Sequence, residues 1–223
     1  MREKGAMAMI YGCCEAAARI AWLNGLWLLF TLCGGIVLGW APSTAAMFAV
    51  VRKWLRGHAD VPVFQTFYQT YKKEFIKTNG LGLILAAIGW MLFVNHQFFQ
   101  GRADLFSIMV SYSTWLAGVL YIMVLMYIFP LYVHFEMPFV RYFSQAVLIG
   151  MLRPLTTIAM AASGAAVVYV LMTVPGLIPF YGISLFALVW MFLAHRCFLG
   201  LGNAASAKKD KQAKKYGYTD AEY

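Results

Sequence analysis

The sequence predicts an all-α fold: a polytopic membrane helical bundle with five transmembrane helices and further amphipathic helices at the cytoplasmic membrane surface. Composition is the first indication. Hydrophobic residues make up 62% of the 223 residues and charged residues only 12%, whereas a soluble domain has about 25% charged residues. The second indication is the pairing of five long apolar stretches with an uneven distribution of Lys and Arg between them. Lipid is therefore the expected solvent for most of this chain.

The five apolar stretches meet or approach the roughly 20 residues that a helix needs to cross a bilayer. They cover residues 20–40, 79–95, 107–134, 155–174 and 180–199. The third is longer than one crossing requires and contains Pro130, which predicts a tilt, a kink or an extension beyond the membrane surface. We expect one membrane domain over residues 1–200, followed by a Lys-rich cytoplasmic tail over residues 201–223.

The basic residues favour one orientation. With the N-terminus outside, 14 of the 18 Lys and Arg residues fall on the inner side and 4 on the outer side. The positive-inside rule therefore predicts an outer N-terminus and an inner C-terminus. We expect five Lys of the tail to contact anionic lipids, at about 1 kcal/mol each near the surface: Lys208, Lys209, Lys211, Lys214 and Lys215. The net charge of +9 is thus explained by a membrane surface, and we expect no nucleic-acid partner.

The inner connections carry amphipathic patterns over residues 43–56, 61–78 and 137–152. In each, apolar and aromatic residues recur at helical spacing while basic residues lie largely off that stripe, which predicts helices on the inner membrane surface. We expect this face to dock a partner. Its candidate docking residues are Trp54, Arg52, Arg56, Phe64, Phe67, Tyr71, Phe139 and Arg141.

Two of these segments open in the same way, at a separation of 76 residues. Asp60-Val61-Pro62 corresponds to Glu136-Met137-Pro138, and each acid and Pro suits the start of a helix. One interpretation is a duplicated unit, namely a parallel repeat. The other is that Pro-started interfacial helices simply recur in membrane proteins, and the sequence leaves both open.

No pattern in the sequence indicates catalysis. None of the acidic residues lies in the middle of a predicted span, no nucleophile has an evident base, and the four Cys lack metal-ligand spacing. His134 and His195 fit interfacial or helix-capping positions. Asn24 and other polar residues of the spans are interpreted as helix contacts. We therefore expect no enzyme and no catalytic, cofactor or metal site.

Three segments carry a resemblance to a known family. They are the run PSTAAMFAVVRKWLRG from Pro42, the run DVPVFQTFYQTYKKEF from Asp60, and the run FPLYVHFEMPFVRYF from Phe129. These runs resemble the YesL family of bacterial membrane proteins, and the likeness covers residues 18–199. The resemblance implies a bacterial cell membrane location and an association, by gene context, with uptake and breakdown of complex oligosaccharides beside ATP-driven sugar importers. It supplies no site residues, because the family is itself largely uncharacterised.

Two functions follow as expectations. The first is an accessory or regulatory membrane protein that docks through its cytoplasmic helices onto subunits of a sugar importer. The second is a small transporter for a sugar or another small solute, acting as a homo-oligomer because five spans enclose only a narrow path. The asymmetry between the two faces and the family context favour the first.

Overall fold

The computed structural model describes residues 2–58, 60–102 and 104–215, with side chains from residue 11 to residue 200. Within this part all regular secondary structure is helical. The elements are α1 (Arg2–Cys33), α2 (Trp40–Leu55), α3 (Val63–Phe99), α4 (Leu105–His134), α5 (Phe139–Leu152), α6 (Pro154–Thr173), the short 3-10 helix η1 (Pro175–Leu177) and α7 (Ile178–Lys215). By length and composition, five helices suffice to cross a membrane: Tyr11–Cys33, Val63–Phe99, Leu105–His134, Pro154–Thr173 and Pro175–Gly200. The predicted fold class is confirmed.

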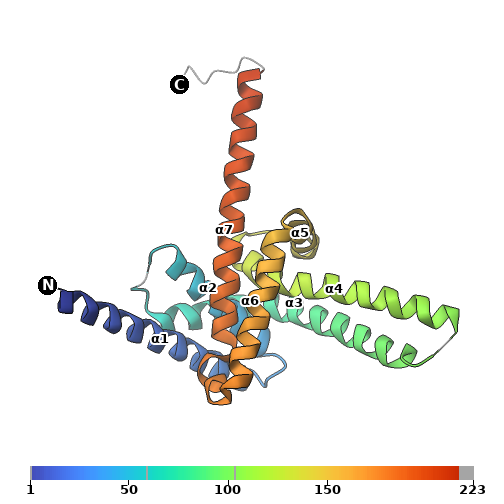
Figure 1. The fold of residues 1–223 in the computed structure, drawn as a ribbon, viewed down its shortest axis with the longest axis horizontal. Coiled ribbons are helices and arrows are strands. Elements are labelled where there is room, and N and C mark those ends of the chain that lie inside the picture. The colour runs from blue at the N-terminus through green and yellow to red at the C-terminus, as the bar shows by residue number, and fades with distance from the viewer. Residues whose placement is uncertain (1, 59, 103, 216–223) are drawn as a thin grey trace.

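Two helical hairpins extend from a central region (Figure 1). α3 and α4 pair with each other and project to one side, whereas α6 and α7 form a second pair that runs in a different direction in this view. α1 extends away from the α3–α4 hairpin. α2 occupies the centre, because it contacts α1, α3, α4 and α7.

The first helix ends earlier than the predicted span at residues 20–40. The chain leaves α1 after Cys33 and makes a tight turn, in which Gly35 and Ile36 have φ angles of +72° and 64°. Such angles are unfavourable for a β-branched residue and easy for glycine. Gly39 closes the turn so tightly that an added Cβ would collide with the backbone of Thr31. The apolar run at residues 20–40 therefore contributes to two helices, and α2 begins at Trp40.

α2 is a packed core helix, which the amphipathic pattern of residues 43–56 did not indicate. Residues on all of its sides are buried up to its last turn. Small residues explain this, because Ala41, Ala45 and Ala46 let neighbouring helices approach closely. At the closest point of α3, a Cβ added to Gly82 would strike Ala41 and Trp40.

α3 joins two predicted segments, residues 61–78 and 79–95, into one continuous helix. It starts directly after Pro62, as α5 starts directly after Pro138, and both prolines have extended backbone angles. The second segment then differs, because Pro154 disfavours a helical conformation at Arg153 and separates α5 from α6. The two acid-x-Pro segments thus share their start and differ in their continuation.

The remaining helices nearly coincide with their predictions. α4 stays one continuous helix through the buried Pro130, and the side chain of Asp104 accepts a hydrogen bond from the backbone N–H of Ser107 at its start. Hydrogen bonds from Ser107 also hold the pKa of the Asp104 carboxyl below its usual value. α7 continues as a helix beyond residue 200, where the tail was predicted to begin. The five tail Lys named above lie outside the described side chains.

The side-chain amide of Asn24 bonds α1 to α7. The Nδ2 of Asn24 donates to the backbone oxygen of Pro179 at 2.7 Å, and its Oδ1 accepts from the backbone N–H groups of Ile183 and Ser184, both at 3.1 Å. Asn24 is buried. The prediction that Asn24 marks a helix contact is confirmed, and these bonds connect α1 to the first two turns of α7.

Candidate functional site

Two of the predicted docking residues, Phe67 and Tyr71, contact α1. Phe67 is fully buried, and its ring centroid lies 5.2 Å from that of Phe30 on α1. Tyr71 is half-buried, and its hydroxyl donates to the backbone oxygen of Phe30 at 3.2 Å. Both side chains pack α3 against α1. The prediction of Phe67 as a docking residue is therefore wrong for this arrangement, whereas Tyr71 keeps part of its surface accessible.

Phe64 lies one turn before Phe67 and faces outward. Its side chain is 50% exposed and stacks on Tyr68, which is 45% exposed, with ring centroids 6.2 Å apart and an interplanar angle of 2°. Tyr68 was missing from the predicted docking set, although the i,i+4 spacing from Phe64 could have indicated it. We call Phe64 and Tyr68 the α3 aromatic pair.

The other predicted docking residues are partly accessible. Arg56 and Arg141 are exposed. Phe139 is half-buried against Phe143, with ring centroids 6.1 Å apart. Trp54 is half-buried, and its buried Nε1 has no hydrogen-bond partner among the described residues.

Four basic side chains from three helices gather at one end of α2. Arg52 and Arg56 come from the C-terminal end of α2, His134 is the last residue of α4, and His195 lies on α7. The two imidazole rings have centroids 5.5 Å apart, and the charges of both Arg side chains act on His134. We call these four residues the basic cluster. Sequence reasoning missed the pairing of the two His because they belong to helices far apart in the chain.

The basic cluster carries positive charge, and several of its nitrogen atoms lack hydrogen-bond partners. Arg52 Nε, His134 Nδ1 and His195 Nδ1 are buried and have no hydrogen-bond partner among the described residues. Burial, and then the charge of Arg56, lower the pKa of the Arg52 guanidinium from its usual value. The described residues also contain no group of three His, Cys, Asp or Glu that could hold a metal. The arrangement suits a negatively charged group.

A carboxylate joins α3 to α4 elsewhere. The hydroxyl of Tyr132 donates to Oε2 of Glu74 at 2.6 Å. Tyr142 of α5 packs on Tyr132, and its hydroxyl donates to the backbone oxygen of Phe135. Glu74 was not singled out from the sequence, where it sits among charged residues. These contacts fix the connection between α4 and α5.

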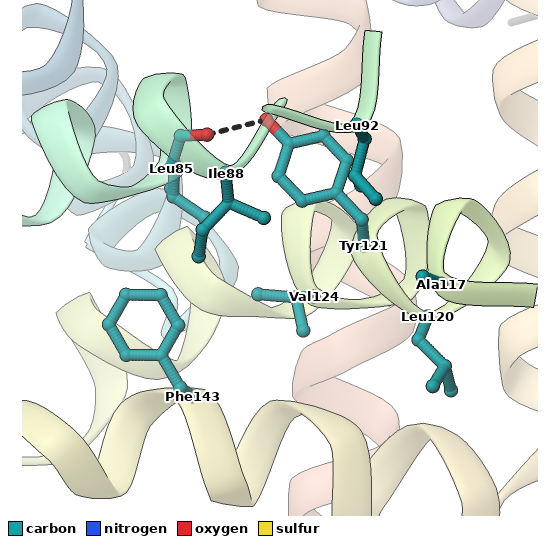
Figure 2. A pocket seen from close by; sticks show the side chains of 8 residues that line it. All are labelled: Leu85, Ile88, Leu92, Ala117, Leu120, Tyr121, Val124 and Phe143. Atoms are coloured by element: carbon teal, nitrogen blue, oxygen red, sulfur yellow. Dashed lines mark hydrogen bonds between the residues drawn. The ribbon is translucent and has the colours of Figure 1, made fainter. Parts of the chain in front are cut away.

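An apolar groove of about 250 Å³ lies between α3 and α4, with Phe143 of α5 at one side (Figure 2). The only polar tip drawn among its lining side chains, the hydroxyl of Tyr121, donates to the backbone oxygen of Leu85 at 2.9 Å. The groove therefore presents hydrocarbon and aromatic surface, which suits an acyl chain better than a sugar.

Five apolar helices together with an electropositive end define a multi-pass helical membrane protein. The model of the family described as "Protein of unknown function, DUF624" matches residues 20–96. Uncharacterized protein YesV of Bacillus subtilis is 56% identical over 189 residues, covering 85% of this chain and 91% of the relative. Uncharacterized proteins YteU and YesL of the same organism are 36% and 32% identical, covering 89% and 88% of this chain and 89% and 92% of the relatives. The chain belongs to this YesL-like family of unknown function, as its resemblance predicted. No solved structure matches it.

Proposed function

We propose that the protein is an accessory or regulatory subunit in the bacterial cell membrane, associated with carbohydrate uptake, which docks onto subunits of an ATP-driven sugar importer. The observation that supports docking is the exposed α3 aromatic pair. It lies beside the basic end of α2, because Lys53 Nζ of α2 donates to Thr66 Oγ1 of α3 at 3.3 Å. The importer is suggested by the family resemblance alone.

The α3 aromatic pair and the basic end of α2 together form a surface whose composition suits a protein partner. Aromatic residues and Arg are enriched where proteins bind one another and often contribute most of the binding energy. Phe64 and Tyr68 are held in place from below, because Phe30 packs against both rings with centroids 6.3 Å and 6.1 Å away. A side chain that is already ordered loses less entropy when a partner binds.

The test is recovery of importer subunits with the protein from membranes of its native host. We expect Phe64→Glu to lower the recovery of permease or ATPase subunits at least about tenfold, because it places a charge where an aromatic anchor binds. Phe98→Glu is the matched control: Phe98 is an exposed Phe near the other end of α3, and its variant should recover the subunits normally. Equal recovery with both variants, or absence of importer subunits from the wild-type sample, would contradict the proposal.

A transporter acting as a homo-oligomer makes a different prediction. The purified protein alone would then move a labelled sugar or another small solute into liposomes. We expect no flux above that of empty liposomes, because the accessory role assigns translocation to the partner. Flux that requires only this protein would replace the accessory role with transport.

A further inference from the structure

Docking through the α3 aromatic pair does not account for the basic cluster. Arg52, Arg56, His134 and His195 bring two guanidinium charges and two imidazole rings together from α2, α4 and α7. Like charges at this proximity repel one another, and the repulsion is strongest where the groups are partly removed from water.

No carboxylate of the described residues balances this charge. The ion pairs in the described part join Arg19 to Glu15 at 2.6 Å and Lys73 to Glu74 at 3.9 Å, and neither includes a member of the basic cluster. Buried polar nitrogens are normally hydrogen-bonded, yet Arg52 Nε and one nitrogen of each His have no partner in this part of the chain. An external anion would compensate the charge.

The surroundings of the cluster indicate which anion. His134 is the final residue of a candidate membrane span, and His195 lies near the end of another. In the predicted topology these span ends fall at the level of lipid headgroups. The ring of His134 also packs against Phe135 and Phe198, with centroids 4.7 Å and 5.0 Å away. A site with cationic groups beside aromatic rings suits a molecule that is anionic at one end and apolar at the other.

We propose that the basic cluster is a binding site for the phosphate of an anionic phospholipid headgroup. Guanidinium groups hold phosphate oxygens through paired hydrogen bonds, and basic pockets between membrane helices bind anionic headgroups. The site differs from the predicted contacts of the Lys-rich tail, because it is built from three helices and can select one lipid molecule. It is also independent of docking to an importer.

The test is native mass spectrometry of the full-length protein in detergent, titrated separately with phosphatidylglycerol, phosphatidylcholine and inorganic phosphate. We expect one phosphatidylglycerol to bind in preference to phosphatidylcholine. The double change Arg52→Gln and Arg56→Gln should weaken that binding about tenfold or more, because it removes two charge-assisted contacts. The matched control is Lys72→Gln with Lys77→Gln, which removes the same charge from exposed positions of α3 and should change binding less than about twofold.

Equal weakening by the two double variants would overturn the proposal, because binding would then follow net charge alone. Inorganic phosphate that displaces phosphatidylglycerol at equal concentration would assign the site to a soluble ligand and overturn the lipid assignment. If the Arg variant aggregates on size-exclusion chromatography, His134→Gln with His195→Gln replaces it. This variant keeps both Arg residues, and unchanged phosphatidylglycerol binding by it would equally contradict the proposal.

Discussion

Asn24 shows how one polar side chain can join two long apolar helices. Its amide makes three hydrogen bonds to the backbone of α7. Asn79, also buried, makes none, and neither of its amide atoms has a partner among the described residues. The same residue type therefore has opposite energetic consequences at the two positions, because a buried amide is favourable only when it is hydrogen-bonded.

We therefore expect Asn24→Leu to lower the free energy of unfolding by about 1–2 kcal/mol, the scale of interhelical hydrogen bonds in membranes. Asn79→Leu should be neutral or stabilising, because it removes an unsatisfied amide at similar volume. Thermal unfolding in detergent, followed by the loss of the monodisperse chromatographic peak, measures both. A lower unfolding temperature for Asn79→Leu than for Asn24→Leu would show that the bonds to α7 are not what stabilises this contact.

The aromatic stripe of α3 shows what one residue pattern can and cannot predict. Helical spacing correctly places Phe64, Phe67 and Tyr71 on related faces, but only Phe64 is exposed. Phe30 of α1 lies closer to the rings of Phe67 and Tyr71, with centroids 5.2 Å and 5.0 Å away, than to the ring of Phe64, at 6.3 Å. A contact supplied by a distant helix leaves no local signal, so the sequence could predict the stripe and not its division into core and surface.

At the scale of elements, the packing of α2 against α3 depends on glycine. Gly82 lies where a Cβ would meet Ala41 and Trp40 of α2, whereas nothing lies within 4 Å of a Cβ added at Gly118 of α4. Gly82→Ala should thus destabilise the protein by about 1–3 kcal/mol through overpacking. Gly118→Ala should be neutral or stabilising, since Ala is the better helix former.

The measurement is the unfolding temperature of both variants under identical detergent conditions. A decrease for Gly82→Ala alone is the expected result. Equal temperatures would mean that α2 can move away from α3 without loss, which would contradict the close packing of these two helices.

Helix boundaries were predictable where a proline precedes the helix or where an apolar stretch meets polar residues. The starts of α3 and α5 follow Pro62 and Pro138, and α4 and α6 closely match their apolar stretches. The end of α1 was missed because Cys33 to Trp40 is apolar throughout, so hydropathy hides a turn made by glycine. The core position of α2 was missed because its small residues carry weak hydropathy yet pack closely. The basic cluster needed three helices to be placed before it could be recognised.

At the scale of the whole molecule, the distribution of basic residues predicts the orientation in the membrane. The fifth candidate span is that of α7, and the basic end of α2 and Arg153, which follows α5, belong to the inner side in this prediction. A green fluorescent protein fused after Tyr223 should therefore fluoresce, since it folds in the cytoplasm, and alkaline phosphatase fused there should be inactive. The same reporters placed at Gly101, between α3 and α4, should give the reverse result, because three predicted crossings separate that position from the C-terminus. Matching signals from Tyr223 and Gly101 would mean an even number of crossings between them, which contradicts five spans. Reversed signals at both positions would keep the five spans and show that the positive-inside rule gives the wrong orientation for this chain.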